Sequence, residues 1–337
     1  MSSADAVAGV LWIGVTLYAV FGGADFGSGF WALVAGGGER GKRARALIDW
    51  AIGPVWEANH VWLIFVLVVL WTGFSEAFAS IMSTLFIPLS LAALGIVLRG
   101  AGFAFHRVAG RESGRRVAEG AFALSSVITP FFMGTVAGAI ASGRVPIGNA
   151  KGDPVTSWLN PVALLIGVLF VVTGAYLAAV FLVSDARRFG EPSLERYFAT
   201  RALGAAAVAG VIAVAGLFVL HSDARYLYDG LTSEGLPFVV VSAACGAGAL
   251  VLLLRRAKRG TRTLAVGAAV AVIWGWGAAQ YPYLLPETLT IEDGAGASTT
   301  LTAVLVVFGA AVVIVVPALA LLYTLDQRSL LEEETGG

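Results

Sequence analysis

The sequence predicts an all-α membrane protein with nine transmembrane helices, arranged as two four-helix bundles plus one extra helix. Of its 337 residues, 58% are hydrophobic and only 13% are charged, and the mean hydropathy is +0.83. Soluble domains contain about 25% charged residues, so this chain has too few polar side chains to cover a globule in water. The composition excludes an ordinary soluble enzyme, a disordered chain and a nucleic-acid-binding protein.

Nine apolar segments reach the roughly 20 residues that a helix needs to cross the hydrocarbon core of a bilayer. Hydropathy places them at 8–34, 52–72, 78–98, 119–141, 159–184, 202–220, 236–254, 263–284 and 301–325. The loops between them hold at most about 20 residues, which leaves no room for a soluble domain.

The distribution of Lys and Arg predicts the orientation of these helices. If alternate loops are assigned to opposite sides of the membrane, 19 of the 22 Lys and Arg residues fall on one side. Only Arg144, Lys151 and Arg225 fall on the other. Cytoplasmic loops carry the excess of Lys and Arg, so we expect the N-terminus outside and the C-terminus in the cytoplasm.

Loop lengths alternate in the same way in both halves of the chain, long inside and short outside. This alternation predicts a first four-helix bundle over residues 1–141 and a second over 142–284. A ninth transmembrane helix and a cytoplasmic tail follow over 285–337. No residue-level repeat accompanies the division.

Few polar side chains fall inside the predicted spans. Asp25 lies in the first span within a glycine-rich stretch, and Glu57, Asn59 and His60 lie near the start of the second. Arg99 lies at the inner end of the third. Ionisable groups are costly in hydrocarbon, so each of them is a candidate functional residue.

The two carboxylates fall at similar depth. Asp25 lies nine residues before the predicted inner end of its span, and Glu57 lies five residues after the start of the next. At about 1.5 Å per residue both fall in the inner half of the membrane, and consecutive spans usually pack side by side. We expect Asp25, Glu57 and His60 to form a proton pathway open to the cytoplasm, with Asn59 and Arg99 as polar support. The alternative is a structural role, in which the carboxylates bind backbone groups freed by the glycine run and a nearby proline.

The chain offers few ligands for a redox cofactor. Only one of its three histidines, His60, lies well inside a predicted span, and the single cysteine, Cys245, permits no disulfide within the chain. Axial haem ligation needs His, Met, Cys or Tyr at membrane depth. We therefore expect no cofactor and no metal in this chain, so that any redox group sits in a partner.

Three motifs occur in order at three successive spans. Residues 25–29 match an Asp followed by a glycine-rich stretch (DxGxG), and residues 54–63 are similar to the form PxWDGNxVWL. Residues 99–107 are similar to the form RGxxFEFR. Together the motifs, the nine-span layout and the chain length resemble subunit II of the cytochrome bd quinol oxidases over nearly the whole sequence.

The sequence departs from the family pattern at three positions. Glu57 stands where the family has Asp, which keeps a carboxylate but lengthens its reach. Ala58 replaces a glycine. Ala104 replaces the Glu of the third motif, which removes one acidic group from that site.

The resemblance implies a complex of the bacterial cytoplasmic membrane that oxidises membrane quinol and reduces dioxygen to water with cytoplasmic protons. It implies that a partner of similar fold, subunit I, holds haem b and haem d. This chain would then stabilise subunit I and contribute to its proton supply, and a structural quinone has been associated with subunit II in the family. The resemblance does not decide whether the substrate is ubiquinol or menaquinol. It also leaves open whether the complex has a small third subunit.

Two other functions stay open on the residues alone. One is a secondary transporter coupled to protons through Asp25 and Glu57, although the two halves lack the paired helix interruptions that are typical of transporter sites. The other is a scaffold in which the carboxylates have only a structural role.

Overall fold

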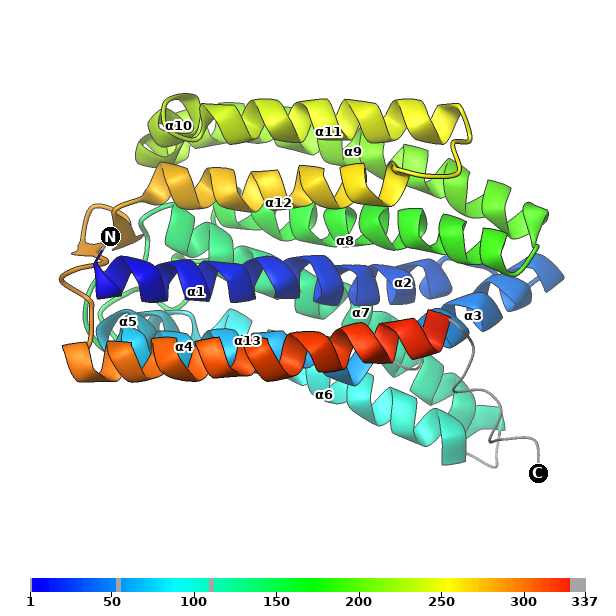
Figure 1. The fold of residues 1–337 in the computed structure, drawn as a ribbon, viewed down its shortest axis with the longest axis horizontal. Helices are drawn as coiled ribbons and strands as arrows, with labels where there is room; N and C mark the ends of the chain where they lie inside the picture. The colour runs from blue at the N-terminus through cyan, green and yellow to red at the C-terminus, as the bar shows by residue number, and fades with distance from the viewer. Residues whose placement is uncertain (1, 53–55, 109–111, 328–337) are drawn as a thin grey trace.

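The computed structural model describes residues 2–52, 56–108 and 112–327 of the chain. Long helices run side by side along one direction, and α3 lies at the end opposite the N-terminus (Figure 1). The elements are α1 (Ser3–Leu17), η1 (Tyr18–Gly22), α2 (Gly23–Leu33), α3 (Glu39–Ile52), α4 (Trp56–Gly73), α5 (Ser75–Thr84), α6 (Phe86–Val108), α7 (Glu112–Ala141), α8 (Pro161–Arg188), α9 (Pro192–Asp223), α10 (Arg225–Thr232), α11 (Leu236–Leu254), α12 (Thr261–Gln280), β1 (Tyr283–Leu285), β2 (Leu289–Thr290) and α13 (Ser298–Gln327).

Several of these helices are suited to crossing a membrane. Among the described residues, seven are long and apolar enough, or eight if α5 and α6 count as one bent span. The first is the continuous rod Ser3–Leu33, which α1, η1 and α2 form together, and α4 is a shorter apolar helix. A helical multi-pass membrane protein is therefore confirmed, and the count of nine spans stays a prediction.

The predicted third span, 78–98, is not one continuous helix. The axes of α5 and α6 differ by 85°, and the break falls between Thr84 and Phe86. Pro88 lies in the first turn of α6, where a backbone N–H would have no partner within the helix, so proline is tolerated there. Because α6 continues to Val108, Arg99 lies within this helix and not at its end.

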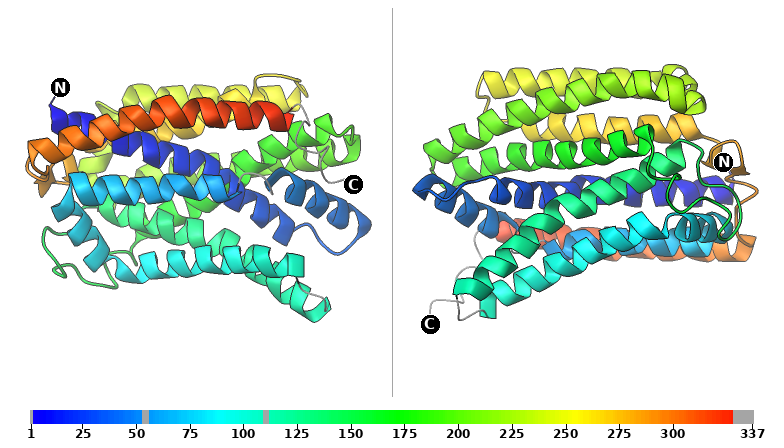
Figure 2. Two further views of the ribbon diagram at one scale, coloured as in Figure 1. Left: turned by 60° about the horizontal axis from the view of Figure 1, so that its bottom comes forward. Right: turned by 180° about the vertical axis from the view of Figure 1, so that it is seen from behind.

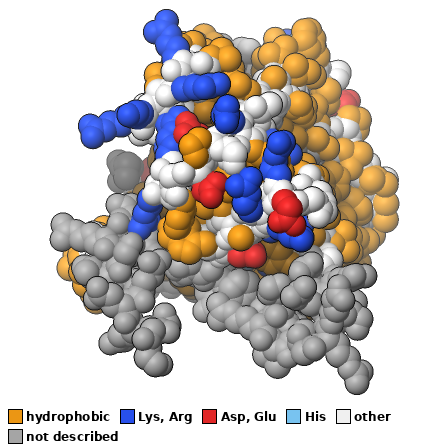
Figure 3. Space-filling model, turned by 90° about the vertical axis from the view of Figure 1, so that its right-hand side faces the viewer, with side chains coloured by type: hydrophobic (Ala, Val, Ile, Leu, Met, Phe, Trp, Pro, Cys, Tyr) orange, Lys and Arg blue, Asp and Glu red, His pale blue; other side chains and the backbone are white. Residues whose placement is uncertain are grey.

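The sequence analysis did not predict α3, α10 or the small antiparallel hairpin of β1 and β2. Helix α3 is amphipathic. Its Ala44, Leu47 and Ile48 are buried in a cluster with residues of α8 and α9, such as Val183 and Phe198. Lys and Arg side chains gather at this end of the molecule (Figure 3). We call it the basic end; it corresponds to the predicted cytoplasmic side.

The two halves of the chain pack closely against each other. Helix α2 contacts both α7 and α8, and the last helix, α13, packs against α1 and α4 of the first half. Helices α6 and α7 lie oblique to the others (Figure 2). The division into two bundles at residue 141 stays a prediction.

Glycines set the distance between α2 and α8. A Cβ atom at Gly27 would collide with the carbonyl oxygen of Gly174, and one at Gly174 would lie 2.6 Å from the carbonyl oxygen of Gly23. Small residues allow membrane helices to approach this closely. The crossing therefore fixes the position of Asp25, which lies between Gly23 and Gly27 in α2.

A single methyl group at this crossing should destabilise the protein. We expect Gly27→Ala to lower the free energy of unfolding by about 1–3 kcal/mol, the usual cost of overpacking. Gly204→Ala in α9 is the matched control, because no atom lies within 4 Å of its added Cβ. The measurement is the thermal unfolding midpoint of the purified protein; equal midpoints for the two variants would contradict the close crossing.

Candidate functional site

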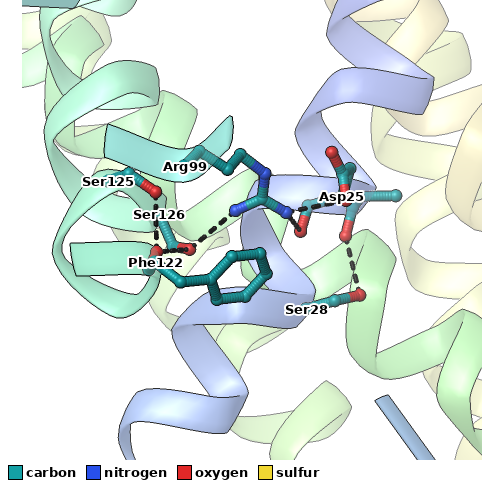
Figure 4. Close-up of polar contacts among 7 residues, drawn as sticks. Asp25, Ser28, Arg99, Phe122, Ser125 and Ser126 are labelled. Carbon is teal, nitrogen blue, oxygen red and sulfur yellow. Dashed lines mark hydrogen bonds and ion pairs between the residues drawn. The ribbon is translucent and has the colours of Figure 1, made fainter. Parts of the chain in front are cut away.

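The main polar feature inside the helices is an ion pair between Asp25 of α2 and Arg99 of α6 (Figure 4). Arg99 Nη2 lies 2.7 Å from Asp25 Oδ1 and donates a second hydrogen bond to the Asp25 carbonyl oxygen at 3.0 Å. The side chains are 0% and 1% exposed for Arg99 and Asp25. A buried charge needs such a partner, because removing it from water is costly.

Helix α7 completes the surroundings of the guanidinium. Arg99 Nη1 donates to Ser126 Oγ at 3.0 Å, and Ser126 in turn donates to the carbonyl oxygen of Phe122 at 2.9 Å. The Arg99 Cζ atom lies 4.2 Å from the centre of the Phe122 ring and 4.9 Å from that of Phe26. Arg99 thus joins α2, α6 and α7 through hydrogen bonds and cation–π contacts.

The local sequence explains how these groups meet. The π-helical turn η1, Tyr18–Gly22, directly precedes the turn of α2 that carries Asp25, and such turns change the direction in which the following side chains point. Gly29 lies one turn beyond Asp25, where a Cβ atom would collide with Ser126 Oγ. The glycine therefore lets α7 bring Ser126 to Arg99.

Three polar atoms at this site have no hydrogen-bond partner among the described residues. They are Asp25 Oδ2, Arg99 Nε and Tyr18 Oη, and all three are buried. Both Asp25 and Arg99 also act electrostatically on Tyr18. Buried polar groups in proteins nearly always bind another group or ordered water, so these three atoms are positions at which ordered water can bind.

His60 of α4 lies beside the ion pair. Its ring centre is 5.6 Å from that of Phe26 and 6.2 Å from that of Tyr18. Both Asp25 and Arg99 act electrostatically on the imidazole. The structure therefore brings three of the predicted residues, Asp25, His60 and Arg99, into one region.

The other two predicted residues are placed less completely. Asn59 is buried in α4. Glu57 belongs to the first turn of α4, one turn before His60, but its side chain lies outside the part of the chain that the structure describes. The predicted proximity of the Asp25 and Glu57 carboxylates therefore stays a prediction.

The sequence analysis treated Arg99 only as support at a helix end, and it did not find the direct partner of Asp25. It also missed Tyr18 and Ser126. The sequence did contain a signal for Ser126, because Ser125 and Ser126 interrupt an otherwise apolar span. Their partners lie on other helices, so spacing along the chain could not reveal them.

Among the described residues, no group of three or more His, Cys, Asp or Glu side chains could hold a metal ion. The exposed His221 lies 2.7 Å from Arg225 Nη1 through its Nε2. The placement of redox groups in a partner stays a prediction.

Comparison with known proteins identifies the family. A family model described as "Cytochrome bd terminal oxidase subunit II" matches residues 4–326. The chain belongs to this family. Its members are subunits of quinol oxidases, so this subunit II chain is part of an oxidoreductase complex.

Relatives and a solved structure agree with the assignment. The subunit II chain is 27% identical over 256 residues to cytochrome bd ubiquinol oxidase subunit 2 of Bacillus subtilis (strain 168), covering 75% of this chain and 72% of the relative. A second protein of that strain, provisionally named cytochrome bd menaquinol oxidase subunit II, is 23% identical over 96% of both chains. The bd oxidase structure from Geobacillus thermodenitrificans has a TM-score of 0.77 and 25% sequence identity, covering 96% of this chain and 98% of that one.

Removing either charge of the buried pair should destabilise subunit II. We expect Arg99→Gln to cost about 3–5 kcal/mol, since it leaves an uncompensated buried carboxylate. Asp25→Asn should cost a similar amount, and the double variant Asp25→Asn/Arg99→Gln should recover most of the loss. Thermal unfolding of the four proteins forms a double-mutant cycle.

The control for this cycle is Lys42→Gln. It breaks an exposed ion pair with Glu39, whose side chain is 83% exposed, and should change stability by less than about 0.5 kcal/mol. A single variant at position 25 or 99 that is as stable as the control would show that the pair is not held as described.

Proposed function

We propose that this chain supports a haem-bearing subunit I in a cytochrome bd-type terminal oxidase, which oxidises membrane quinol and reduces dioxygen to water. The observation that carries the proposal is a polar site buried among apolar helices in a chain that matches the subunit II family over residues 4–326. The family assignment favours this function over a secondary transporter. Haem b and haem d belong to the partner in this proposal, and a structural quinone is compatible with it.

We propose that the chain crosses the bacterial cytoplasmic membrane nine times. Counting α4 as a span and α5 with α6 as one bent span adds two crossings to the seven long helices. The basic end, with α3, then faces the cytoplasm, because cytoplasmic loops carry the excess of Lys and Arg. The N-terminus lies outside.

The proposed role of the buried site is to pass cytoplasmic protons toward subunit I. Arg99 binds Asp25 Oδ1 and leaves Oδ2 buried and without a partner among the described residues. His60 lies in α4 one turn after Glu57, where the proposed path begins, and its ring centre is 5.6 Å from that of Phe26. In this proposal Arg99 keeps Asp25 oriented, while Oδ2, Tyr18 and His60 hold the hydrogen-bonded chain along which the proton moves.

The test must separate proton supply from assembly. In the complex of both subunits, we expect Glu57→Gln and the charge-balanced double variant Asp25→Asn/Arg99→Gln to lower quinol-dependent oxygen consumption by about a hundredfold. That is the lower end of what a positioned proton-transfer group contributes. The visible haem absorbance of each purified complex reports whether subunit I is still assembled and loaded.

Glu76→Gln is the matched control, because Glu76 is an exposed carboxylate at the start of α5 and should leave turnover unchanged. Wild-type turnover in both Glu57→Gln and the double variant, with haem intact, would contradict a proton path through this chain. Loss of the haem spectrum together with turnover would instead assign the residues to assembly.

A further inference from the structure

A second group of buried polar atoms lies at the basic end, away from Asp25. Ser193, Tyr197 and Arg201 follow each other at intervals of four residues in α9, so they lie on one face of the helix. Ser193 Oγ, Tyr197 Oη and Arg201 Nε are each buried and have no hydrogen-bond partner among the described residues. A hydroxyl, a phenol and a guanidinium in one row form a set of donors.

Arg201 lacks a carboxylate partner within the described part of the chain. Its Cζ atom lies 3.2 Å from the centre of the Tyr197 ring and 5.7 Å from that of Trp31, and its Nη1 donates to the Tyr197 carbonyl oxygen at 3.3 Å. Arg40 of α3, a second cation, acts electrostatically on Arg201. None of the ion pairs found among the described residues includes either of these two guanidinium groups.

Three acidic side chains at the basic end are paired with other cations. The ion pairs are Glu39–Lys42, Glu191–Arg43 and Glu195–Arg187. Arg40 and Arg201 thus contribute to the positive charge at the basic end that these three carboxylates leave unpaired. An anion with several acceptor oxygens would neutralise both and would give the buried donors of α9 their partners.

We propose that Arg40, Arg201, Tyr197 and Ser193 bind the phosphate group of an anionic phospholipid of the leaflet at the basic end. Phosphate is the chemistry that two guanidinium groups and two hydroxyls recognise. The surroundings favour a lipid over a free ion. Trp31 and Tyr197 are residues typical of membrane interfaces, and Val208, seven residues after Arg201 on the same face of α9, is 49% exposed where an acyl chain would lie.

The test uses the purified complex of both subunits, freed of lipid in detergent and titrated by native mass spectrometry. The probes are phosphatidylglycerol, phosphatidylcholine and inorganic phosphate. We expect the complex to bind phosphatidylglycerol in preference to the other two. Arg201→Gln and Arg40→Gln should each weaken that binding about fivefold, the factor that one basic residue contributes at an anionic membrane surface.

Arg196→Gln is the matched control, because Arg196 is an exposed arginine of the same helix whose Nε donates to the Pro192 carbonyl oxygen. It should bind phosphatidylglycerol as the wild type does. An equal loss in Arg196→Gln, equal binding of phosphatidylcholine, or competition by inorganic phosphate at the same concentration as the lipid would each overturn the proposal. If Arg201→Gln fails to assemble, the exposed Arg40→Gln decides the result. The inference requires only that the chain spans a membrane, and it holds whether or not Asp25 carries protons.

Discussion

The structure depends on the cost of placing charge among apolar helices. An isolated Asp25 or Arg99 would be too costly to bury. The pair is tolerated because Arg99 donates hydrogen bonds to a carboxylate, a backbone carbonyl and a serine hydroxyl. Those three acceptors come from α2 and α7, so satisfying one guanidinium holds three helices together. The glycines of α2 make these contacts possible, since they let α7 and α8 approach α2 closely.

A buried pair of this kind is weak evidence for stability alone, because well-packed apolar residues are often as stable. Its unsatisfied atoms are more informative. Asp25 Oδ2, Tyr18 Oη and Arg99 Nε remain without partners among the described residues, beside the imidazole of His60. A site built only for packing would leave fewer donors and acceptors unused. They are atoms to which ordered water can bind, which is what the proposed proton route requires.

Composition and charge distribution were sufficient to predict a helical membrane protein with one strongly basic end, because both follow from the cost of polar groups in lipid. Hydropathy missed α3 and α10, which are short and amphipathic, and it merged α5 with part of α6 because both are apolar. Asp25, His60 and Arg99 were found as rare polar residues in apolar segments. The pairing of Asp25 with Arg99, 74 positions apart, was not predictable from spacing, since helix packing alone brings them together.

The most direct test of the account is a high-resolution cryo-electron microscopy map of the complete complex in a lipid nanodisc, with ordered water resolved. The account predicts water bound to Asp25 Oδ2 and Tyr18 Oη, in a chain that continues past His60 and Glu57 to the basic end. Dry apolar packing around both carboxylates, with no water-filled route from that end, would contradict it.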